Sequence, residues 1–128
     1  CRVSKHELLT SVSNVDAVFL CFHWSVSNHQ FFGASYLNAM KNDSFLVNTS
    51  RGENLDELHL MTLIENGKFS GVALDVLANE QSENFRASLM LALAEREERL
   101  LVTPHVAGVS IDSERIAFEL ILDRIVNQ

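Results

Sequence analysis

Four short and almost entirely apolar runs divide the chain at regular intervals. They cover residues 15–22, 44–49, 71–77 and 100–103. Their starts lie roughly 27–29 residues apart, about the length of one βα unit. Runs that are apolar on both faces are typical of strands in a parallel sheet that helices cover on both sides. The pattern therefore predicts four buried, parallel strands.

The stretches between these runs have helical spacing. Ser4 can cap a first helix over residues 4–11, with Glu7 at the capping-box position. Further helices are predicted over 34–40, 55–66 and 84–98, and a last one begins at its cap, Asp112. Gly67 suits the left-handed end of the third helix. The expected inward residues of the third and fourth helices are Leu55, Leu58, Met61 (or Leu60) and Ile64, then Phe85, Leu89 and Leu93.

The alternation of helices and strands sets the fold class. Parallel strands joined by right-handed crossovers are the default for such an order. We therefore expect an α/β fold: a partial doubly wound parallel sheet, Rossmann-like, of about four parallel strands with flanking helices. A chain of 128 residues suits one domain, 1–128.

Composition narrows the classes of partner. The net charge is −7, which makes a nucleic-acid backbone an unsuitable partner. No apolar run approaches the ~20 residues of a membrane span. Cys1 and Cys21 form neither a disulfide framework nor a metal-ligand pair, and Cys21 is expected to be a small buried residue. We expect a reduced, cytoplasmic protein without a metal site.

Each predicted strand is followed by a polar side chain that is suited to binding or catalysis. His23 follows the first strand, Arg51 the second and His105 the fourth, while Glu80 lies just beyond the third. The carboxyl ends of parallel strands meet at one edge of the sheet, where ligands bind. Arg51, Glu80 and His105 can therefore converge although they are distant in sequence.

These three side chains have complementary chemical properties. Arginine offers a planar charged fork for a carboxylate, histidine exchanges protons near neutral pH, and a glutamate stabilises the imidazolium. Each also has an ordinary interpretation. Arg51 suits a turn, Glu80 a solvated loop and His105 a structural role. Asp75, inside an apolar strand, must find a partner.

Three strings along the chain together resemble the D-isomer-specific 2-hydroxyacid dehydrogenases. They are Val-Asn-Thr-Ser-Arg-Gly at 47–52, Gly-Val-Ala-Leu-Asp-Val at 71–76 with Glu80, and Thr-Pro-His-Val-Ala-Gly at 103–108. Arg51 lies 29 residues before Glu80, and Glu80 lies 25 before His105, both within the family's range. The resemblance extends over residues 3–126 and corresponds to the later half of that family's nucleotide-binding domain.

The resemblance implies a role for each matching residue. Arg51, Glu80 and His105 would be catalytic. NAD or NADP would be the cofactor and a small 2-hydroxy or 2-keto acid the substrate, and a homodimer is expected. The implied cofactor-binding residues are Phe22, His23, Trp24, Thr49, Ser50, Asp75 and Gly108.

The glycine-rich phosphate loop of a dinucleotide fold cannot be found in this sequence. None of the five glycines makes the spacing Gly-x-Gly-x-x-Gly. We therefore expect a partial NAD(P)-binding domain whose loop would lie upstream of Cys1. Such a fragment should bind the cofactor weakly or not at all and be inactive alone. A non-catalytic, truncated dimerisation or binding module of the same fold is the alternative.

Overall fold

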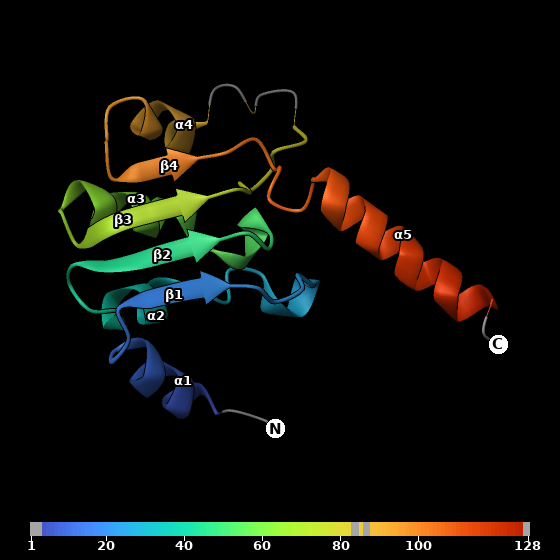
Figure 1. The fold of residues 1–128 in the computed structure, drawn as a ribbon. Coiled ribbons are helices and arrows are strands. Elements are labelled where there is room, and N and C mark those ends of the chain that lie inside the picture. The colour runs from blue at the N-terminus through green and yellow to red at the C-terminus, as the bar shows by residue number, and fades with distance from the viewer. Residues whose placement is uncertain (1–3, 83–84, 86–87, 127–128) are drawn as a thin grey trace.

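A single parallel sheet organises the structure, a computed structural model that describes residues 4–82, 85 and 88–126. Its strands are β1 (Ala17–Leu20), β2 (Ser44–Asn48), β3 (Phe69–Leu74) and β4 (Leu100–Val102). They lie side by side in the order β1-β2-β3-β4, and all neighbouring pairs are parallel (Figure 1). The predicted α/β fold class is confirmed.

The helices begin and end mostly where local signals placed them. They are α1 (Lys5–Val12), α2 (Ala34–Ala39), α3 (Glu57–Glu65), α4 (Leu89–Ala94) and α5 (Ile111–Val126), with 3-10 turns η1 (Val26–Asn28) and η2 (Gly52–Asn54). Ser4 and Glu7 form the predicted capping box of α1. Gly67, with φ of 74°, follows the end of α3 in the left-handed region.

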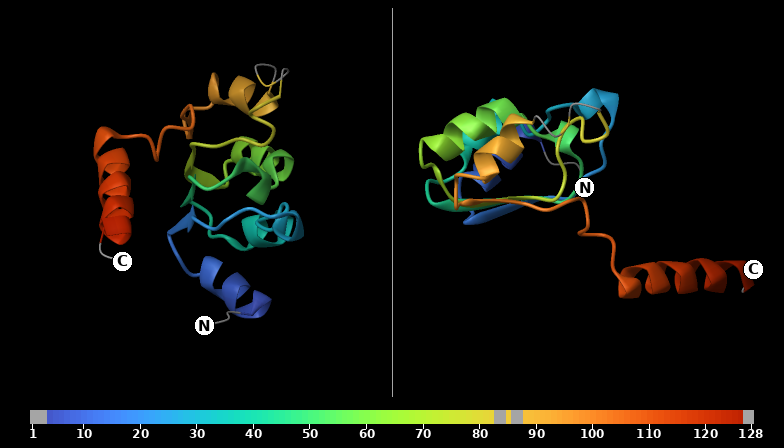
Figure 2. Two further views of the ribbon diagram at one scale, coloured as in Figure 1. Left: turned by 90° about the vertical axis from the view of Figure 1, so that its right-hand side faces the viewer. Right: turned by 90° about the horizontal axis from the view of Figure 1, so that it is seen from above.

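Helices cover one face of the sheet. Because each strand lies beside the preceding one in the same direction, right-handed crossovers carry α2, α3 and α4 to the same side (Figure 2). The other face leaves Phe19, Phe45 and Leu101 exposed to 66%, 50% and 60%. The expected cover on both faces is therefore wrong for the described residues. Strand composition does not reveal which face has a partner.

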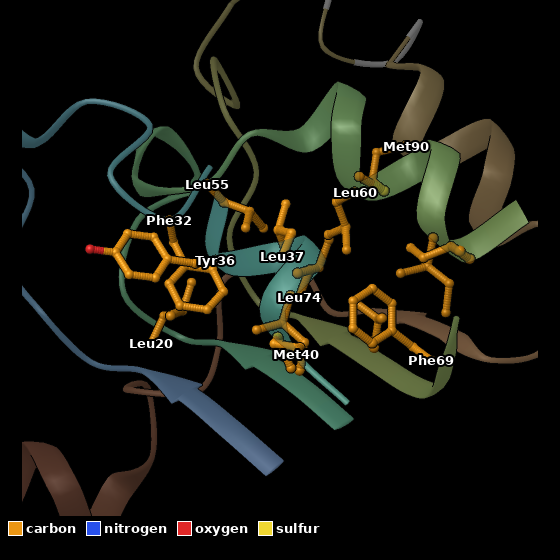
Figure 3. Close-up of a cluster of buried hydrophobic side chains, with 14 of the residues drawn as sticks. Leu20, Phe32, Tyr36, Leu37, Met40, Leu55, Leu60, Phe69, Leu74 and Met90 are labelled. Carbon is orange, nitrogen blue, oxygen red and sulfur yellow. The ribbon is translucent and has the colours of Figure 1, made fainter. Parts of the chain in front are cut away.

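The hydrophobic core lies between the sheet and these helices (Figure 3). Phe32 and Tyr36 stack with ring centroids 5.4 Å apart at one end of it. Leucines and methionines from the strands and from α2, α3 and α4 fill the rest, among them Leu20, Leu37, Met40, Leu46, Leu60, Leu74, Met90 and Leu93.

The predicted inward residues of two helices are confirmed in part: Leu55, Leu60, Ile64 and Leu93 are buried, but one residue predicted inward in each helix is exposed. In α3 the buried residues are Leu60 and Ile64, whereas Leu58 is exposed. In α4 they are Met90 and Leu93, whereas Leu89 is exposed. Both helices are short; α4 contains only apolar residues and α3 has a wide apolar face, so periodicity alone does not select the residues that meet the sheet.

Three further expectations need correction. The helix predicted over 84–98 is confined to α4, with residues 83–84 and 86–87 outside the described residues. Ser110 rather than Asp112 caps α5, because its hydroxyl accepts from the Ser113 amide at 3.0 Å. Cys21 is exposed, because it lies on the same uncovered face as Phe19, whereas Leu20 and Phe22 on either side of it pack toward the core. Cys1 lies outside the described residues.

The last helix stands apart from the rest. α5 follows β4 at the edge where the strands end; it extends away from the sheet in Figure 1 and in the right-hand view of Figure 2, and the left-hand view shows it separate from the other elements. Its apolar side chains Ile116, Phe118, Leu120 and Leu122 are exposed. Across the described ranges, α5 and the other helices all fall short of the length and apolar character that a bilayer crossing requires.

Candidate active site

The three predicted catalytic residues all follow strands at the carboxyl edge of the sheet. Arg51 lies just after β2, Glu80 lies in the loop after β3, and His105 follows β4. These are the loops beyond the arrowheads in Figure 1. The parallel topology thus brings them to one side of the molecule.

Glu80 and His105 contact each other directly. Oε1 of Glu80 lies 2.5 Å from Nδ1 of His105, and Oε2 of Glu80 accepts from the Leu77 amide at 3.3 Å. Beside an ionised carboxylate, which can only accept, Nδ1 carries the ring proton. The side chains are 44% and 24% exposed for His105 and Glu80 respectively. The pair is therefore reachable from solvent.

Asp75 holds the backbone on which His105 sits. One of its oxygens accepts from the Thr103 hydroxyl at 2.5 Å and from the Val106 amide at 2.9 Å. The other accepts from the Ala107 amide at 2.9 Å. His105 itself has φ of 54°, a left-handed conformation that costs energy unless its surroundings fix it. The bonds to the next two amides supply that restraint.

Hydrogen bonding keeps Asp75 ionised inside the protein. The residue is 5% exposed, and burial by itself would raise the pKa of its carboxyl group. The bonds from Thr103, Ala107 and Val106, with the nearby His105, outweigh burial and lower that pKa below its ordinary value of 3.8. The prediction that Asp75, an acid in an apolar run, has polar partners is confirmed by these hydrogen bonds.

A hollow of about 440 Å³ opens beside this pair. Its polar lining comes from Asp75, Glu80, Thr103 and His105, and its apolar lining from Leu77, Phe85, Leu91, Val102 and Pro104. A small apolar space with a few converging polar groups is the usual form of a ligand site.

Arg51 lies in a neighbouring hollow and does not join the pair. That hollow, of about 340 Å³, is lined by Cys21, Phe22, His23, Thr49, Ser50 and Arg51. The guanidinium donates from Nη1 to the Ser50 carbonyl at 2.6 Å. Within the described ranges the structure records no hydrogen bond or salt bridge from Arg51 to Glu80 or His105. The structure therefore brings two of the three residues together and leaves the third nearby on the same edge.

Two buried asparagines that the sequence argument did not single out shape the Arg51 turn. Asn48 donates to the Arg51 carbonyl at 3.0 Å and accepts from the Ser50 amide at 3.0 Å. Asn54 donates to the Phe22 carbonyl and the Ser50 hydroxyl, both at 3.0 Å. Asn48 could have been found by the signal that identified Asp75, a polar residue inside an apolar strand. Asn54 lies in a polar stretch and carries no such signal.

Gly52 joins this turn to the loop that carries Glu80. A Cβ atom at Gly52 would lie 2.0 Å from both the Ala78 nitrogen and the Leu77 carbonyl carbon. Only glycine permits so close an approach of two backbones. The Arg51 turn and the Leu77–Ala78 peptide are therefore in direct backbone contact.

The remaining predicted cofactor residues have varied surroundings. Trp24 has a buried Nε1 without a hydrogen-bond partner among the described residues. Gly108 lies in the turn before α5, where an added Cβ would meet nothing within 4 Å, and its carbonyl accepts from the Ser113 hydroxyl. In the part of the chain that the structure describes, no three His, Cys, Asp or Glu residues are grouped to hold a metal ion.

Comparison with known families identifies the domain. Residues 2–107 match the family model described as D-isomer specific 2-hydroxyacid dehydrogenase, NAD binding domain. The glycerate dehydrogenase of Methylorubrum extorquens is 29% identical over 119 residues, which are 93% of this chain and 37% of that protein. The (S)-sulfolactate dehydrogenase of Chromohalobacter salexigens is 34% identical over 112 residues, 87% of this chain and 34% of that protein. The chain spans about a third of the length of such curated relatives.

Solved structures agree with this match. D-lactate dehydrogenase with NAD+ from Lactobacillus jensenii superposes with a TM-score of 0.75 at 29% identity, over 89% of this chain and 36% of that one. The NAD complex of the D-isomer specific 2-hydroxyacid dehydrogenase from Lactobacillus delbrueckii ssp. bulgaricus gives 0.76 at 26% identity, over 91% and 38%. The chain therefore belongs to the D-isomer specific 2-hydroxyacid dehydrogenase family and matches its NAD binding domain.

Proposed function

We propose that this chain is part of an NAD-dependent oxidoreductase that interconverts a 2-hydroxy acid and a 2-keto acid. The hydrogen bond between Glu80 and His105 carries the proposal, because it pairs a proton-exchanging ring with a carboxylate at the ligand-binding edge of the sheet. A non-catalytic binding module has no need of such a pair. For that reason we favour the enzyme.

Each of the three residues has a distinct task in this proposal. His105 exchanges a proton with the substrate oxygen through Nε2, since Nδ1 is engaged by Glu80. Glu80 keeps the ring oriented and stabilises its charged form. Arg51 binds the substrate carboxylate through its planar fork. The bound nicotinamide supplies or accepts the hydride, while the protein supplies position and the proton.

The residues beside Arg51 fit a dinucleotide. The hollow there combines an aromatic ring (Phe22), an imidazole (His23), and the hydroxyl groups of Thr49 and Ser50. The buried Nε1 of Trp24, which has no hydrogen-bond partner in the described ranges, is a further donor nearby in sequence. These residues, with Asp75 and Gly108, would hold NAD or NADP. The sequence supplies no glycine-rich loop for the pyrophosphate, so we expect this chain alone to bind NADH weakly.

The oligomeric state and the cellular location are further parts of the proposal. The exposed apolar side chains Phe19, Phe45 and Leu101 on the uncovered sheet face support association into a homodimer. Light scattering at high concentration tests this, and a monomer would contradict it. We also propose a cytoplasmic location, where the exposed thiol of Cys21 would stay reduced.

Turnover of the natural gene product containing this chain tests the proposed function. Oxidation of NADH is followed with a panel of small 2-keto acids, and substrate-dependent turnover is expected. Calorimetry with NADH on the present chain tests the cofactor part separately. No turnover with any 2-keto acid, in a protein that binds NADH, would overturn the proposal.

A further inference from the structure

The short segment that carries Glu80 is held by three carboxylates. Three consecutive backbone amides, those of Leu77, Ala78 and Asn79, each donate to a glutamate. Leu77 donates to Glu80 at 3.3 Å and Asn79 to Glu53 at 3.3 Å. The shortest bond joins Ala78 to Oε1 of Glu57 at 2.6 Å, across 21 residues of sequence. Segment 77–80 therefore depends on side chains from outside it.

This segment has little regular structure of its own. It lies beyond the end of β3, and Asn79 adopts a left-handed conformation with φ of 56°. Gly52 packs against the segment's backbone so closely that a Cβ atom added at Gly52 would lie 2.0 Å from the Ala78 nitrogen. Glu57 binds that same nitrogen from the first residue of α3. The Leu77–Ala78 peptide is thus fixed both by backbone contact and by a side-chain acceptor.

Attraction to a positive charge does not explain why residue 57 is a glutamate. Burial raises the pKa of Glu57 to about 7, and the charges of Glu53 and Glu80 act in the same direction against the Ala78 hydrogen bond. No salt bridge in the described part of the chain reaches Glu57. Glu57 provides a hydrogen-bond acceptor for the Ala78 amide, which has no other partner among the described residues. Leaving that amide without an acceptor in a partly buried site would cost stability.

Resting on the proposed function, we propose that Glu57 is a positioning residue for the Glu80–His105 pair. It holds the Ala78 amide, and through it segment 77–80, so that the Glu80 carboxylate reaches Nδ1 of His105. The competing explanation is a purely structural one, in which Glu57 only stabilises the first turn of α3 through the helix dipole. The two explanations differ in what happens at the His105 ring.

The test follows the ring nitrogens of His105 by ¹⁵N NMR in this chain, without cofactor or substrate. With Glu80 in place, neutral His105 should carry its proton on Nδ1. Glu57→Ala, which removes the acceptor, should shift the ring toward the Nε2-protonated form, reducing the Nδ1 share several-fold. Glu57→Gln keeps a carbonyl acceptor for Ala78 and should preserve the Nδ1-protonated form of His105. His59, which pairs with Asn38, serves as the internal reference.

Two controls separate positioning from folding. Glu65→Ala changes an exposed residue at the other end of α3 and should leave His105 unchanged. If Glu57→Ala fails to fold, Glu57→Asp decides, because it keeps the charge at the start of α3 but its shorter side chain draws the acceptor back from Ala78. The Nδ1-protonated share of His105 should fall in this variant too.

An unchanged His105 tautomer in a folded Glu57→Ala or Glu57→Asp variant would overturn the inference. Because this measurement does not involve turnover, failure of the proposed enzyme function would appear separately, as an absence of 2-keto acid reduction.

Discussion

Oε1 of Glu80 lies 2.5 Å from Nδ1 of His105, although 25 residues separate them in sequence. The two reach each other because β3 and β4 are parallel neighbours that end at the same edge. Segment 77–80 and the Asp75 bonds then set the final approach. This pair is the part of the candidate site that the fold assembles without a ligand.

Replacing His105 tests its proposed proton-transfer role in the natural gene product. His105→Gln removes the proton donor and keeps similar bulk, so kcat should fall by roughly 10²–10⁴. NADH affinity should change little. Steady-state kinetics and calorimetry measure both. His6→Gln, on exposed α1, is the matched control, and near-full turnover of His105→Gln would remove His105 from the mechanism.

Arg51→Lys tests recognition of the substrate carboxylate. Lysine keeps the charge but loses the planar fork, so KM for the keto acid should rise and kcat should also fall. Initial rates over a range of keto acid concentrations separate the two constants. Arg96→Lys, whose arginine forms an exposed pair with Glu65, should have no effect. Unchanged constants in Arg51→Lys would mean that Arg51 is only a turn residue.

Asp75→Asn should weaken the segment that carries His105. The amide group keeps one acceptor and turns a donor toward backbone amides, so the variant should lose about 2–3 kcal/mol of unfolding free energy at neutral pH. Urea denaturation measures the loss. Asp16→Asn, at an exposed pair with Lys41, should cost almost nothing.

The pH dependence of this loss has a definite sign. The folded-state pKa of Asp75 is depressed below 3.8, so its contribution is present above that value and disappears as the pH falls through the lower folded-state value. The gap between wild type and Asp75→Asn should therefore narrow in strong acid. If the difference in unfolding free energy between wild type and Asp75→Asn stays constant as the pH falls well below 3.8, Asp75 is not ionised in the folded protein.

Gly52→Ala should disturb the contact between the Arg51 turn and the Glu80 segment. Its Cβ would overlap the Leu77–Ala78 backbone at 2.0 Å, and relief requires one backbone to move, at about 1–3 kcal/mol or more. Denaturant unfolding gives the cost. Gly108→Ala is the matched control, because its Cβ would meet nothing within 4 Å. Equal stability of the two variants would refute the close approach.

Glu57→Gln should remove a pH dependence of stability. The folded-state pKa of Glu57 is about 7 against an ordinary 4.5. Between these values the folded protein holds a proton that the unfolded chain has released, so stability falls as the pH rises. Allowing for partial solvent exposure, we expect a loss of ~1–2 kcal/mol across this range. Wild type minus Glu57→Gln isolates it, with exposed Glu65→Gln as the control.

Local signals in the sequence were enough to place the four strands and most of the helix ends. The capping box of Ser4 and Glu7, the left-handed Gly67 and the four apolar runs act within a few residues, and the structure has a helix end or a strand at each. The same alternation fixed the edge at which Arg51, Glu80 and His105 lie, because parallel strands allow only one carboxyl edge.

Only the tertiary structure decided which groups meet at that edge and which face of the sheet is covered. Leu58 and Leu89 are exposed because a short helix with a wide apolar face can meet the sheet in more than one rotation about its axis. The bonds from Asp75 to residues 103–107, from Asn54 to Phe22 and from Glu57 to Ala78 join residues 21 to 32 positions apart. Sequence spacing does not specify such bonds. They depend on how each loop packs once the sheet has formed, and that packing decides where Glu80 and His105 point.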